Sequence, residues 1–249
     1  MPDRDDTTAR LAWLARVPLF QGLGPDALVR VADLAHPAGR AAGAYFFQEG
    51  EQADEFFMLT DGRVRLTQVT PDGHQIVLRL AGPGDVFGGV GTFGYPTYHV
   101  SAEAVTPSRA LAWTSPRMRE LLEAEPGVAL NALHFVAGQL YDLQQRHREL
   151  MTERVERRIA RAVLRLVQDA GRRVDAGIAI DFPVSRQDLA ELTGTTLYTV
   201  SRCLSSWEER GIVRSGRQRI VLVQPESLLA IAEDLPPPSL RSLRPRNDP

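Results

Sequence analysis

The chain has 249 residues, 43% of them hydrophobic and 24% charged, which suffices for one large domain or two smaller ones with separate cores. Its 29 basic residues nearly balance its 31 acidic ones for a net charge of -2, which excludes a uniformly basic chromatin-type protein and a highly charged disordered chain. All the basic residues are Arg, so a P-loop or a Schiff-base mechanism, both of which need Lys, is excluded as well.

Residues 1–115 combine a helical lead-in with many short strands. The amphipathic segment 9–20 and the segment 25–35, which has Pro25 in its first turn, predict two helices. Short β-rich runs follow, separated by turns that contain Gly, Asp or Pro. The runs lie at 44–48, 55–60, 63–69, 75–81, 85–93, 99–105 and 108–113. This pattern predicts a β-sandwich or a small barrel.

Helical patterns dominate residues 116–152. The segment 115–124 predicts one helix, and a longer apolar pattern runs from Pro126 to about Ala170. Steps of three and four define a heptad-like seam of Leu133, Val136, Leu140, Leu143, His147 and Leu150. Such a helix could pack on its own domain, but it exceeds the ~8–20 residues of a typical globular helix. We therefore expect it to pair with a second copy of the chain.

The small net charge hides an uneven distribution. Residues 1–152 carry 13 Arg and 18 acidic residues, whereas residues 153–224 carry 13 Arg and 9 acidic residues. We place a basic domain at 153–235, and a basic domain after a dimer helix predicts a polyanionic partner. The segment 236–249 is Pro-rich and has few apolar side chains, so we expect it to be disordered.

The basic domain contains a pattern typical of a helix-turn-helix. Ser185, with Asp188 three positions later, predicts a capping box at the start of a first helix. Gly194 predicts the left-handed residue that ends this helix, and Thr195 or Thr196 would cap a second one. The buried stripe of the second helix would be Val200, Leu204 and Trp207.

The other face of the second helix would be exposed and could reach DNA bases. An Arg at position 202 on this face can donate two hydrogen bonds to guanine. The predicted DNA-contact residues are Ser185, Arg186, Gln187, Thr196, Leu197, Tyr198, Thr199, Ser201, Arg202, Arg217 and Arg219. An ordinary helical hairpin is the alternative, but the caps, the spacing and the basic surroundings together favour DNA binding.

A basic hairpin follows the second helix. Residues 211–223 predict two short strands around Ser215-Gly216, which would form a wing. Arg214, Arg217 and Arg219 on this wing suit phosphate contacts, which position a protein without reading sequence. Upstream of the two helices lie Arg154, Arg157, Arg158 and Arg161. They form a solvated helix face or touch phosphate, and we favour the solvated face.

The whole layout resembles the CRP/FNR superfamily of bacterial transcription regulators over about residues 15–235. Two patterns match its cyclic-nucleotide-binding β-roll: Gly50-x-x-x-Asp54-x-x-Phe57-x-Leu59-x-x-Gly62-x-Val64-Arg65 and Gly82-x-Gly84-Asp85-x-Phe87-Gly88. A third, Thr199-Val-Ser-Arg202, matches its winged helix-turn-helix. The resemblance implies an α+β protein with a β-roll (double-stranded jelly roll), a long dimerisation helix and a C-terminal winged helix-turn-helix.

The resemblance also implies a homodimer that binds a two-fold-related double-stranded DNA site, contacts RNA polymerase and senses a small molecule in the roll. By the same resemblance, the effector pocket would comprise Gly88, Gly89, Val90, Thr97, Tyr98, His99, Leu143 and Gln144. In the recognition helix, Tyr198 stands where the family usually has Glu, so its base preference should differ.

Three departures from the cAMP-binding members bear on the ligand. Gly89 stands where those members place the Glu that binds ribose, and the Arg that would pair with the phosphate is missing near Tyr98. Leu143-Gln144 align with the Thr-Ser pair that contacts adenine. A buried cyclic phosphate without its Arg would lack a charge partner, so we expect no tight cAMP binding.

The sequence excludes some cofactors of this superfamily and leaves other signals possible. The single cysteine, Cys203, excludes an internal disulfide, a zinc finger and the iron–sulfur cluster of oxygen-sensing members, and we expect a small buried side chain. Haem-dependent sensing of NO or CO is one alternative, because His99 follows the Gly-rich cassette and haem iron accepts a single proximal His. Of the other His residues, His74 is expected on a hairpin and His134 on the long helix. The other alternative is a ligand-independent regulator whose activity is set by abundance.

The sequence does not favour an enzyme or a membrane protein. The His residues form no H-x-H pair, and a Gly-x-Ser-x-Gly elbow is missing. The acidic N-terminal segment has no apolar run long enough for a signal peptide, and no stretch approaches the ~18 apolar residues that span a membrane. We therefore expect a cytoplasmic regulator.

Overall fold

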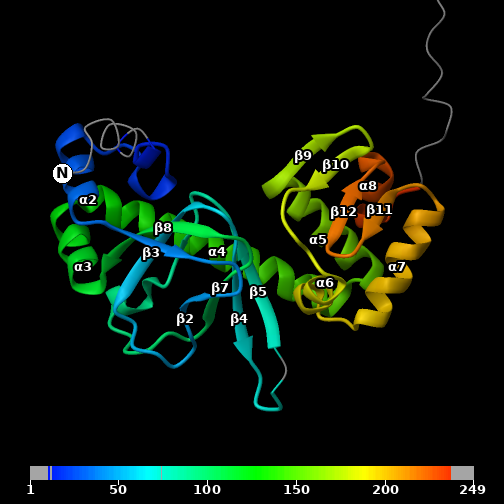
Figure 1. Ribbon diagram of the computed structural model, residues 1–249, viewed down its shortest axis with the longest axis horizontal. Coiled ribbons are helices and arrows are strands. Elements are labelled where there is room, and N and C mark those ends of the chain that lie inside the picture. The colour runs from blue at the N-terminus through cyan, green and yellow to red at the C-terminus, as the bar shows by residue number, and fades with distance from the viewer. Residues whose placement is uncertain (1–10, 12, 74, 237–249) are drawn as a thin grey trace, which may run out of the picture. The chain divides into compact units, whose positions relative to one another are not determined.

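The computed structural model describes residue 11 and residues 13–73 and 75–236 (Figure 1). The chain divides into two compact units, residues 1–146 and 147–249. His74 and, apart from Pro236, the segment expected to be disordered lie outside the described residues. The first expected helix, 9–20, lies partly outside them.

Two short helical elements lead into the first unit. A 3-10 helix, η1 (Pro18–Phe20), is followed by α2 (Pro25–Asp33), which begins with Pro25 directly after its N-cap Gly24. Pro suits this first helical position because its missing N–H would have no partner there. Val31 and Ala32 of α2 are buried in the same core as Phe20, so the lead-in is part of the packed unit.

Two four-stranded sheets form the body of the first unit, and every described strand pair in them is antiparallel. One sheet has the order β1 (His36–Arg40), β8 (Ser108–Thr114), β3 (Glu55–Asp61), β6 (Val86–Phe87). The other has the order β2 (Tyr45–Phe47), β7 (Ser101–Ala104), β4 (Val64–Val69), β5 (Gln75–Ala81). The expected N-terminal β-domain is confirmed.

Strand β3 shows how the first unit builds two cores from one sheet. Successive side chains of a strand point to opposite faces. Phe57 and Leu59 join an aromatic-rich core with residues of both sheets, whereas Phe56 and Met58 join a second core with the helices. The sheet that contains β3 is therefore covered on both faces.

The run 85–93 was predicted as one strand, and this was wrong. Only Val86–Phe87 are extended, and Gly89–Phe93 form a 3-10 helix, η2. Gly88 adopts a left-handed φ of 76°, which a side chain would resist. A Cβ on Gly91 would lie 1.8 Å from the Ala53 carbonyl oxygen, so η2 packs directly on the backbone of the roll.

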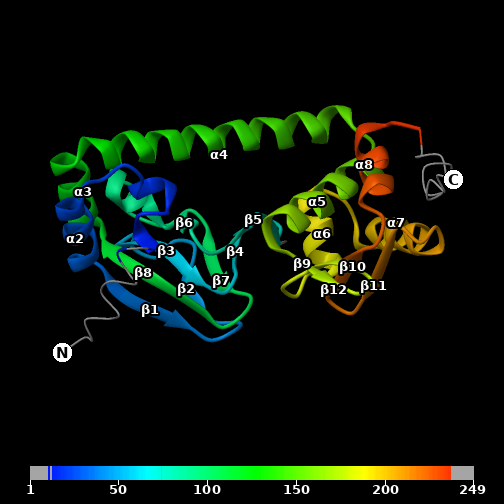
Figure 2. The same ribbon diagram turned by 90° about the horizontal axis from the view of Figure 1, so that it is seen from above.

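Helices follow the sheets. After α3 (Ser115–Ala124), the 27-residue helix α4 (Pro126–Thr152) runs without interruption, as Figure 2 shows. The apolar pattern expected to continue to about Ala170 is broken, because Arg154 is the extended N-cap of a separate helix, α5 (Val155–Ala170).

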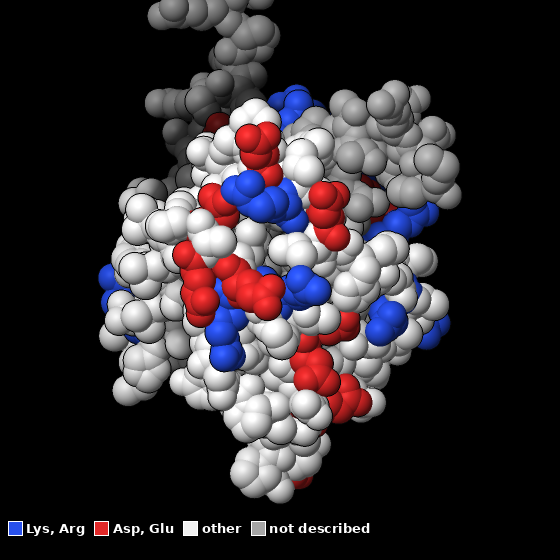
Figure 3. Space-filling view, turned by 90° about the vertical axis from the view of Figure 1, so that its left-hand side faces the viewer, with Lys and Arg blue, Asp and Glu red and all other residues white. Residues whose placement is uncertain are grey.

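The face of the first unit in Figure 3 carries both acidic and basic side chains.

The second unit packs helices against a small sheet of order β11-β12-β10-β9. Its elements after α5 are β9 (Gly171–Val174), β10 (Gly177–Ile180), α6 (Arg186–Thr193), α7 (Leu197–Glu209), β11 (Val213–Gly216), β12 (Arg219–Leu222) and α8 (Pro225–Glu233). Ile159, Leu204 and Trp207 are fully buried at its centre. No described helix of either unit is long and apolar enough to cross a membrane.

Candidate functional site

Two capped helices, α6 and α7, form the predicted helix-turn-helix. The Ser185 hydroxyl accepts a hydrogen bond from the Asp188 N–H at 3.0 Å, and the Asp188 carboxylate accepts one from the Ser185 N–H at 2.8 Å. This is the predicted capping box. Gly194 ends α6 with a left-handed φ of 60°, and Thr196 caps α7 by accepting from the Thr199 N–H. The local signals of the sequence therefore fix both helix starts.

The two faces of α7 differ as predicted. Val200, Leu204 and Trp207 are buried against the rest of the unit. On the opposite face Tyr198 is 74% exposed. The other predicted contacts on this helix are exposed or half-buried: Leu197, Thr199, Ser201 and Arg202. A helix presented in this way can enter the major groove of DNA with its first two turns.

The predicted wing exists, but its turn lies two residues beyond the expected one. Ser215 and Gly216 belong to strand β11, and Gly216 pairs with Arg219. The turn is therefore Arg217-Gln218, and Gln218 takes the left-handed conformation with a φ of 59°. Arg214, Arg217 and Arg219 are all exposed.

Three hydrogen bonds hold the wing against the two helices and the segment before α6. The Glu208 carboxylate of α7 accepts from the Ser215 N–H at 2.6 Å. Arg186, the first residue of α6, donates to the Ser215 hydroxyl at 3.1 Å, and the Val184 N–H donates to the Gln218 carbonyl oxygen. The residues predicted to contact DNA thus come from three elements that are tied together within one unit.

Some predicted contacts already have partners inside the unit. The hydroxyls of Ser185 and Thr196 serve as helix caps, and Gln187 donates to Glu191 at 2.8 Å. Caps of this kind leave the remaining N–H groups at a helix start directed outward, where they can bind a phosphate.

The sensor residues predicted from the resemblance do not all lie together. Tyr98 is 5% exposed, and its ring stacks on Phe47 with 3.7 Å between centroids. Its hydroxyl donates to the Glu55 carbonyl oxygen at 2.8 Å and accepts from the Glu55 N–H at 3.0 Å. Burial raises the pKa of Tyr98 to about 12. Tyr98 is therefore part of the core of the roll.

Aromatic rings fill the space between the two sheets. Phe57 lies 5.3 Å from Phe87 and 5.4 Å from Phe46, measured between ring centroids. A Cβ on Gly88 would lie 3.0 Å from the Phe47 ring. The side of the Gly-rich cassette that faces the interior of the roll is thus closely packed.

The remaining predicted effector residues lie elsewhere on the first unit. Thr97 is half-buried and forms an isolated antiparallel β-bridge with Gln52. His99 is exposed, with its ring edge-on to that of Tyr95 at 5.3 Å. Leu143 and Gln144 are exposed on α4. Gly89 and Val90 line an apolar cavity of about 250 Å³ together with residues of α3 and α4, a site that the sequence reasoning missed.

Comparisons with known proteins give the family. Residues 40–125 match the cyclic nucleotide-binding domain model, and residues 157–231 match the Crp-like helix-turn-helix domain model. The cyclic AMP receptor protein of Thermus thermophilus is 30% identical over 203 residues, which cover 80% of this chain and 89% of that protein. The chain belongs to the CRP/FNR family of transcription regulators.

Other members support the same placement of this CRP/FNR-family regulator. The CRP-like cAMP-activated global transcriptional regulator of Mycobacterium tuberculosis is 26% identical over 215 residues, covering 86% of this chain and 96% of that protein. The solved structure of FixK2 from Bradyrhizobium japonicum is similar with a TM-score of 0.70 at 25% identity, covering 79% of this chain and 96% of that one. The DNA-binding helix-turn-helix and the sensor β-domain are thus family features.

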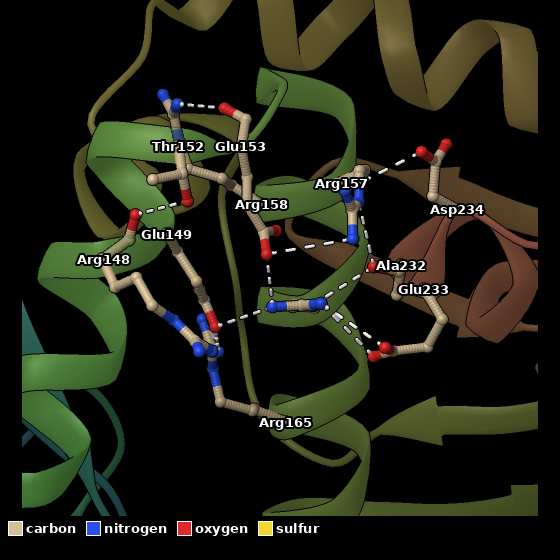
Figure 4. Close-up of polar contacts among 11 residues, drawn as sticks. Arg148, Glu149, Thr152, Glu153, Arg157, Arg158, Arg165, Ala232, Glu233 and Asp234 are labelled. Atoms are coloured by element: carbon tan, nitrogen blue, oxygen red, sulfur yellow. Dashed lines mark hydrogen bonds and ion pairs between the residues drawn. The ribbon is translucent and has the colours of Figure 1, made fainter.

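An ion-pair network in the second unit of the regulator corrects one expectation. Figure 4 shows Arg157, Arg158 and their neighbours turned toward acidic groups and carbonyls. Arg161 lies 2.8 Å from the Glu153 carboxylate and 3.4 Å from the Glu149 carboxylate, and Arg165 lies 3.1 Å from Glu149. The predicted solvated Arg face was therefore wrong for Arg157, Arg158 and Arg161, and holds only for Arg154, which is exposed.

Arg158 connects this network to the helix-turn-helix. Its guanidinium is buried and donates to three carbonyl oxygens, those of Glu153 at 3.0 Å, Thr193 at 3.1 Å and Gly194 at 3.3 Å. Two of these carbonyls belong to the end of α6 and the turn that follows. The sequence signal was the alternation of Glu149 and Glu153 with downstream Arg residues, which indicates internal pairing.

Helix α4 leaves most of its apolar seam uncovered in a single chain. Leu133 is 62% exposed and Leu140 is 54% exposed. The other seam residues are exposed too: Val136, Leu143, His147 and Leu150. By contrast Val128, Ala132 and Phe135 pack on the first unit. The helix therefore has one face for its own unit and one free apolar face.

Cys203 is half-buried in α7, next to Arg202. Burial, and to a lesser degree the nearby Glu156 carboxylate, raise the pKa of its thiol. A thiol with a raised pKa carries little thiolate at neutral pH and is a poor nucleophile, which agrees with a packing role.

Proposed function

We propose that the protein is a homodimeric, sequence-specific regulator that binds a two-fold-related DNA site and is tuned by a small molecule other than cAMP. The observation that carries the proposal is the exposed face of α7, where Tyr198 and Arg202 project beside the basic wing. A capped helix with exposed polar side chains, flanked by Arg, has the form and charge needed to read a major groove.

Most of the predicted contacts fall into two groups in this proposal, one that reads bases and one that contacts phosphates. Arg202 donates two hydrogen bonds to a guanine in each half-site, and Tyr198 contacts the neighbouring base pair. Phosphates are contacted by the wing and by the N-terminal ends of the two helices. The residues in this second group are Ser185, Arg186, Gln187, Thr196, Thr199, Arg217 and Arg219.

Dimerisation through α4 follows from its free apolar face. Exposing Leu133, Leu140 and Leu143 to water costs about 1.5–3 kcal/mol for each side chain relative to burial. A second α4 packed on the same heptad positions covers all of them at once, and two-fold symmetry then matches a two-fold operator. We propose that this dimer acts in the cytoplasm through contacts with RNA polymerase.

The sensor domain does not suit cAMP. Gly89 supplies no carboxylate for a ribose, and Leu143 and Gln144 are exposed on α4. Tyr98 and its aromatic neighbours fill the interior of the roll. A cyclic phosphate would have to displace this packing and would find no Arg near Tyr98 to offset its charge.

Two alternatives concern the signal and not the DNA binding. Haem is the first, because His99 lies exposed beside Tyr95, and Tyr95 lines the apolar cavity. An absorbance band near 400 nm in protein purified with added haem, lost in His99→Ala, would establish it. The second is a regulator without a ligand, and apo protein that binds its operator at full affinity, unchanged by cell-extract metabolites, would establish that.

The decisive experiment is selection of bound DNA from a random pool, with and without small molecules from a cell extract. The proposal predicts an enriched sequence with two inverted half-sites, each containing a guanine that is lost from the consensus selected by Arg202→Ala. Enrichment of no sequence, or of a single half-site bound by one chain, contradicts the proposal.

A further inference from the structure

Strand β11, the first half of the wing, is an edge strand. The sheet of the second unit has the order β11-β12-β10-β9, so β11 pairs with β12 on one side only. Backbone N–H groups of β11 that point away from β12 have no strand to donate to, and they depend on water or on side chains for a partner. Helix α7 lies beside β11 (Figure 1). Side chains of α7 can therefore supply such a partner.

Glu208 of α7 pairs with one of these N–H groups. Its carboxylate accepts a hydrogen bond from the Ser215 N–H at 2.6 Å. Hydrogen bonds to a charged acceptor are shorter and stronger than neutral ones. Both residues are half-buried, so water competes less for the two groups. The Glu208 side chain thus joins the second half of α7 to the backbone of the wing.

Two further hydrogen bonds act on the same short stretch of the wing. The Ser215 hydroxyl accepts from Arg186 at 3.1 Å, and the Gln218 carbonyl oxygen accepts from the Val184 N–H at 3.2 Å. Arg217 lies between the two anchored residues, and its side chain is exposed. The backbone that carries Arg217 is therefore held on both sides, while its guanidinium remains accessible.

An acidic side chain beside a surface that contacts DNA is unexpected on charge alone. Phosphates repel a carboxylate, so a Glu at this place should weaken DNA binding unless it has another role. Glu208 follows Arg202, the residue proposed to read a guanine, by between one and two helical turns. Its carboxylate is turned to the wing. The contact that Glu208 makes is thus with the protein and not with the groove.

We propose that Glu208 is a positioning residue for DNA binding, because its hydrogen bond to Ser215 holds the wing where Arg217 and Arg219 reach phosphates. This inference rests on the proposed function, which assigns phosphate contacts to these two Arg residues. A wing that is already in place loses less conformational freedom when DNA binds, and this preorganisation strengthens binding without a new contact. Since Arg202 lies on α7 itself, its choice of base does not depend on the wing.

The test compares Glu208 with Glu209, the next residue, which is exposed and has the same charge. Fluorescence anisotropy of the full-length protein with a labelled duplex of mixed sequence gives the affinity at several KCl concentrations. Glu208→Met should weaken binding about tenfold, because the wing must then be ordered when DNA binds. The slope of log K against log salt should become shallower by about 1 for each phosphate contact that is lost. Glu209→Met removes the same charge and should bind at least as tightly as the wild type.

Two conservative variants separate the hydrogen bond from the charge. Glu208→Gln keeps an oxygen acceptor at the same reach and should bind as Glu209→Gln does. Glu208→Asp keeps the charge but shortens the side chain, so it should show the loss expected of Glu208→Met, and it replaces that variant if Glu208→Met fails to fold. Hydrogen exchange followed by mass spectrometry should be faster over residues 213–219 in the Met and Asp variants and unchanged in Glu208→Gln.

A double-mutant cycle separates positioning from a general loss of stability. In a protein that already carries Arg217→Ala and Arg219→Ala, Glu208→Met should have no further effect on DNA binding, whereas partial unfolding would weaken binding in either background. Three results overturn the proposal. They are equal affinities of Glu208→Met and Glu209→Met, binding by Glu208→Gln as weak as that of Glu208→Met, and a full effect of Glu208→Met in the background without the wing Arg residues.

The same variants separate this inference from the proposed function. If Arg217→Ala with Arg219→Ala leaves the salt slope unchanged, the phosphate contacts of the wing are contradicted, and the positioning role with them. If that slope becomes shallower while the slope of Glu208→Met does not, the positioning role alone is contradicted. Selection from a random DNA pool by Glu208→Met should return the wild-type consensus, and a different consensus would show that Glu208 acts on α7 and not on the wing.

Discussion

Replacing the buried Arg158 with Met should destabilise the DNA-binding unit. Arg158 is 9% exposed, and its guanidinium donates to the carbonyls of Glu153, Thr193 and Gly194 at 3.0–3.3 Å. Met has a similar length and fills much of the same space, so the change removes the hydrogen bonds with little loss of packing.

The magnitude follows from these three bonds. A hydrogen bond that involves a charged group contributes about 1.5–3 kcal/mol, but removing Arg158 also removes the cost of burying its charge. We expect a net loss of about 2–4 kcal/mol, in line with other broken buried networks. At about 4–8 °C per kcal/mol for a unit of this size, its melting temperature should fall by about 10 °C or more.

Differential scanning calorimetry of the full-length protein measures this loss, and operator titration shows whether the turn still positions α7. The control is Arg154→Met, because Arg154 is the exposed N-cap of the same helix and makes no side-chain capping hydrogen bond. An Arg158→Met protein that melts within about 2 °C of the Arg154→Met control would show that the three carbonyls are satisfied by water, and the reasoning would fail.

Three further changes have defined outcomes. Arg202→Ala should cost about 1–3 kcal/mol per half-site and relax specificity at one base pair, measured by fluorescence anisotropy, whereas Arg210→Ala, exposed at the C-cap of α7, should not. Leu140→Asp should convert the dimer to a monomer in light scattering, because a charge replaces a seam residue, while His134→Asp on the same helix should not. Tyr98 should make the first unit less stable above about pH 10, since the pKa of Tyr98 is raised to about 12 in the folded state. Its stabilising effect is complete below the unfolded pKa of about 10 and is lost as the pH rises toward 12, by about 2–3 kcal/mol. Urea unfolding between pH 8 and 11.5 measures it, and a stability that falls equally in Tyr98→Phe would contradict it.

Local signals in the sequence predicted the recognition region well. The capping box of Ser185 and Asp188, the left-handed Gly194 and the buried stripe of α7 are all present as expected. Each of these features depends only on residues within one or two helical turns of each other, so neighbouring residues in the sequence are enough to predict it. The exposed seam of α4 was predictable for the same reason, because its period is local.

Features that depend on distant partners were missed. The predicted solvated Arg face of α5 failed because Glu149 and Glu153 approach from the end of α4, and Ala232 and Glu233 from α8. Amphipathic spacing says which residues share a helix face, but it does not say what covers that face. Strand β1 was missed because its sequence, His-Pro-Ala-Gly-Arg, has no alternating apolar pattern and pairs with β8 far along the chain.

The position of the wing turn could not be predicted from the preference of Gly for turns. Gly216 was the natural candidate for the turn, since Gly accepts a left-handed backbone without strain. The structure places the left-handed residue at Gln218 instead, and the Gln218 carbonyl accepts a hydrogen bond from Val184. A contact with the segment before α6 thus outweighs the local preference, so the register of the wing is set by tertiary packing.

Helix α4 belongs to both units, since its residues up to Arg146 fall in the first and the remainder in the second. Ala132 and Phe135 pack on the core of the first unit, and Glu149 pairs with Arg161 and Arg165, all three within the second unit. Moving a two-state equilibrium from 1:99 to 99:1 requires a ligand that prefers one state by about 10⁴-fold. A ligand in the aromatic core of the roll would have to displace closely packed side chains. In the dimer that we propose, a ligand against α4 would contact the helix that carries the apolar seam, so its binding energy would bear directly on the dimer arrangement.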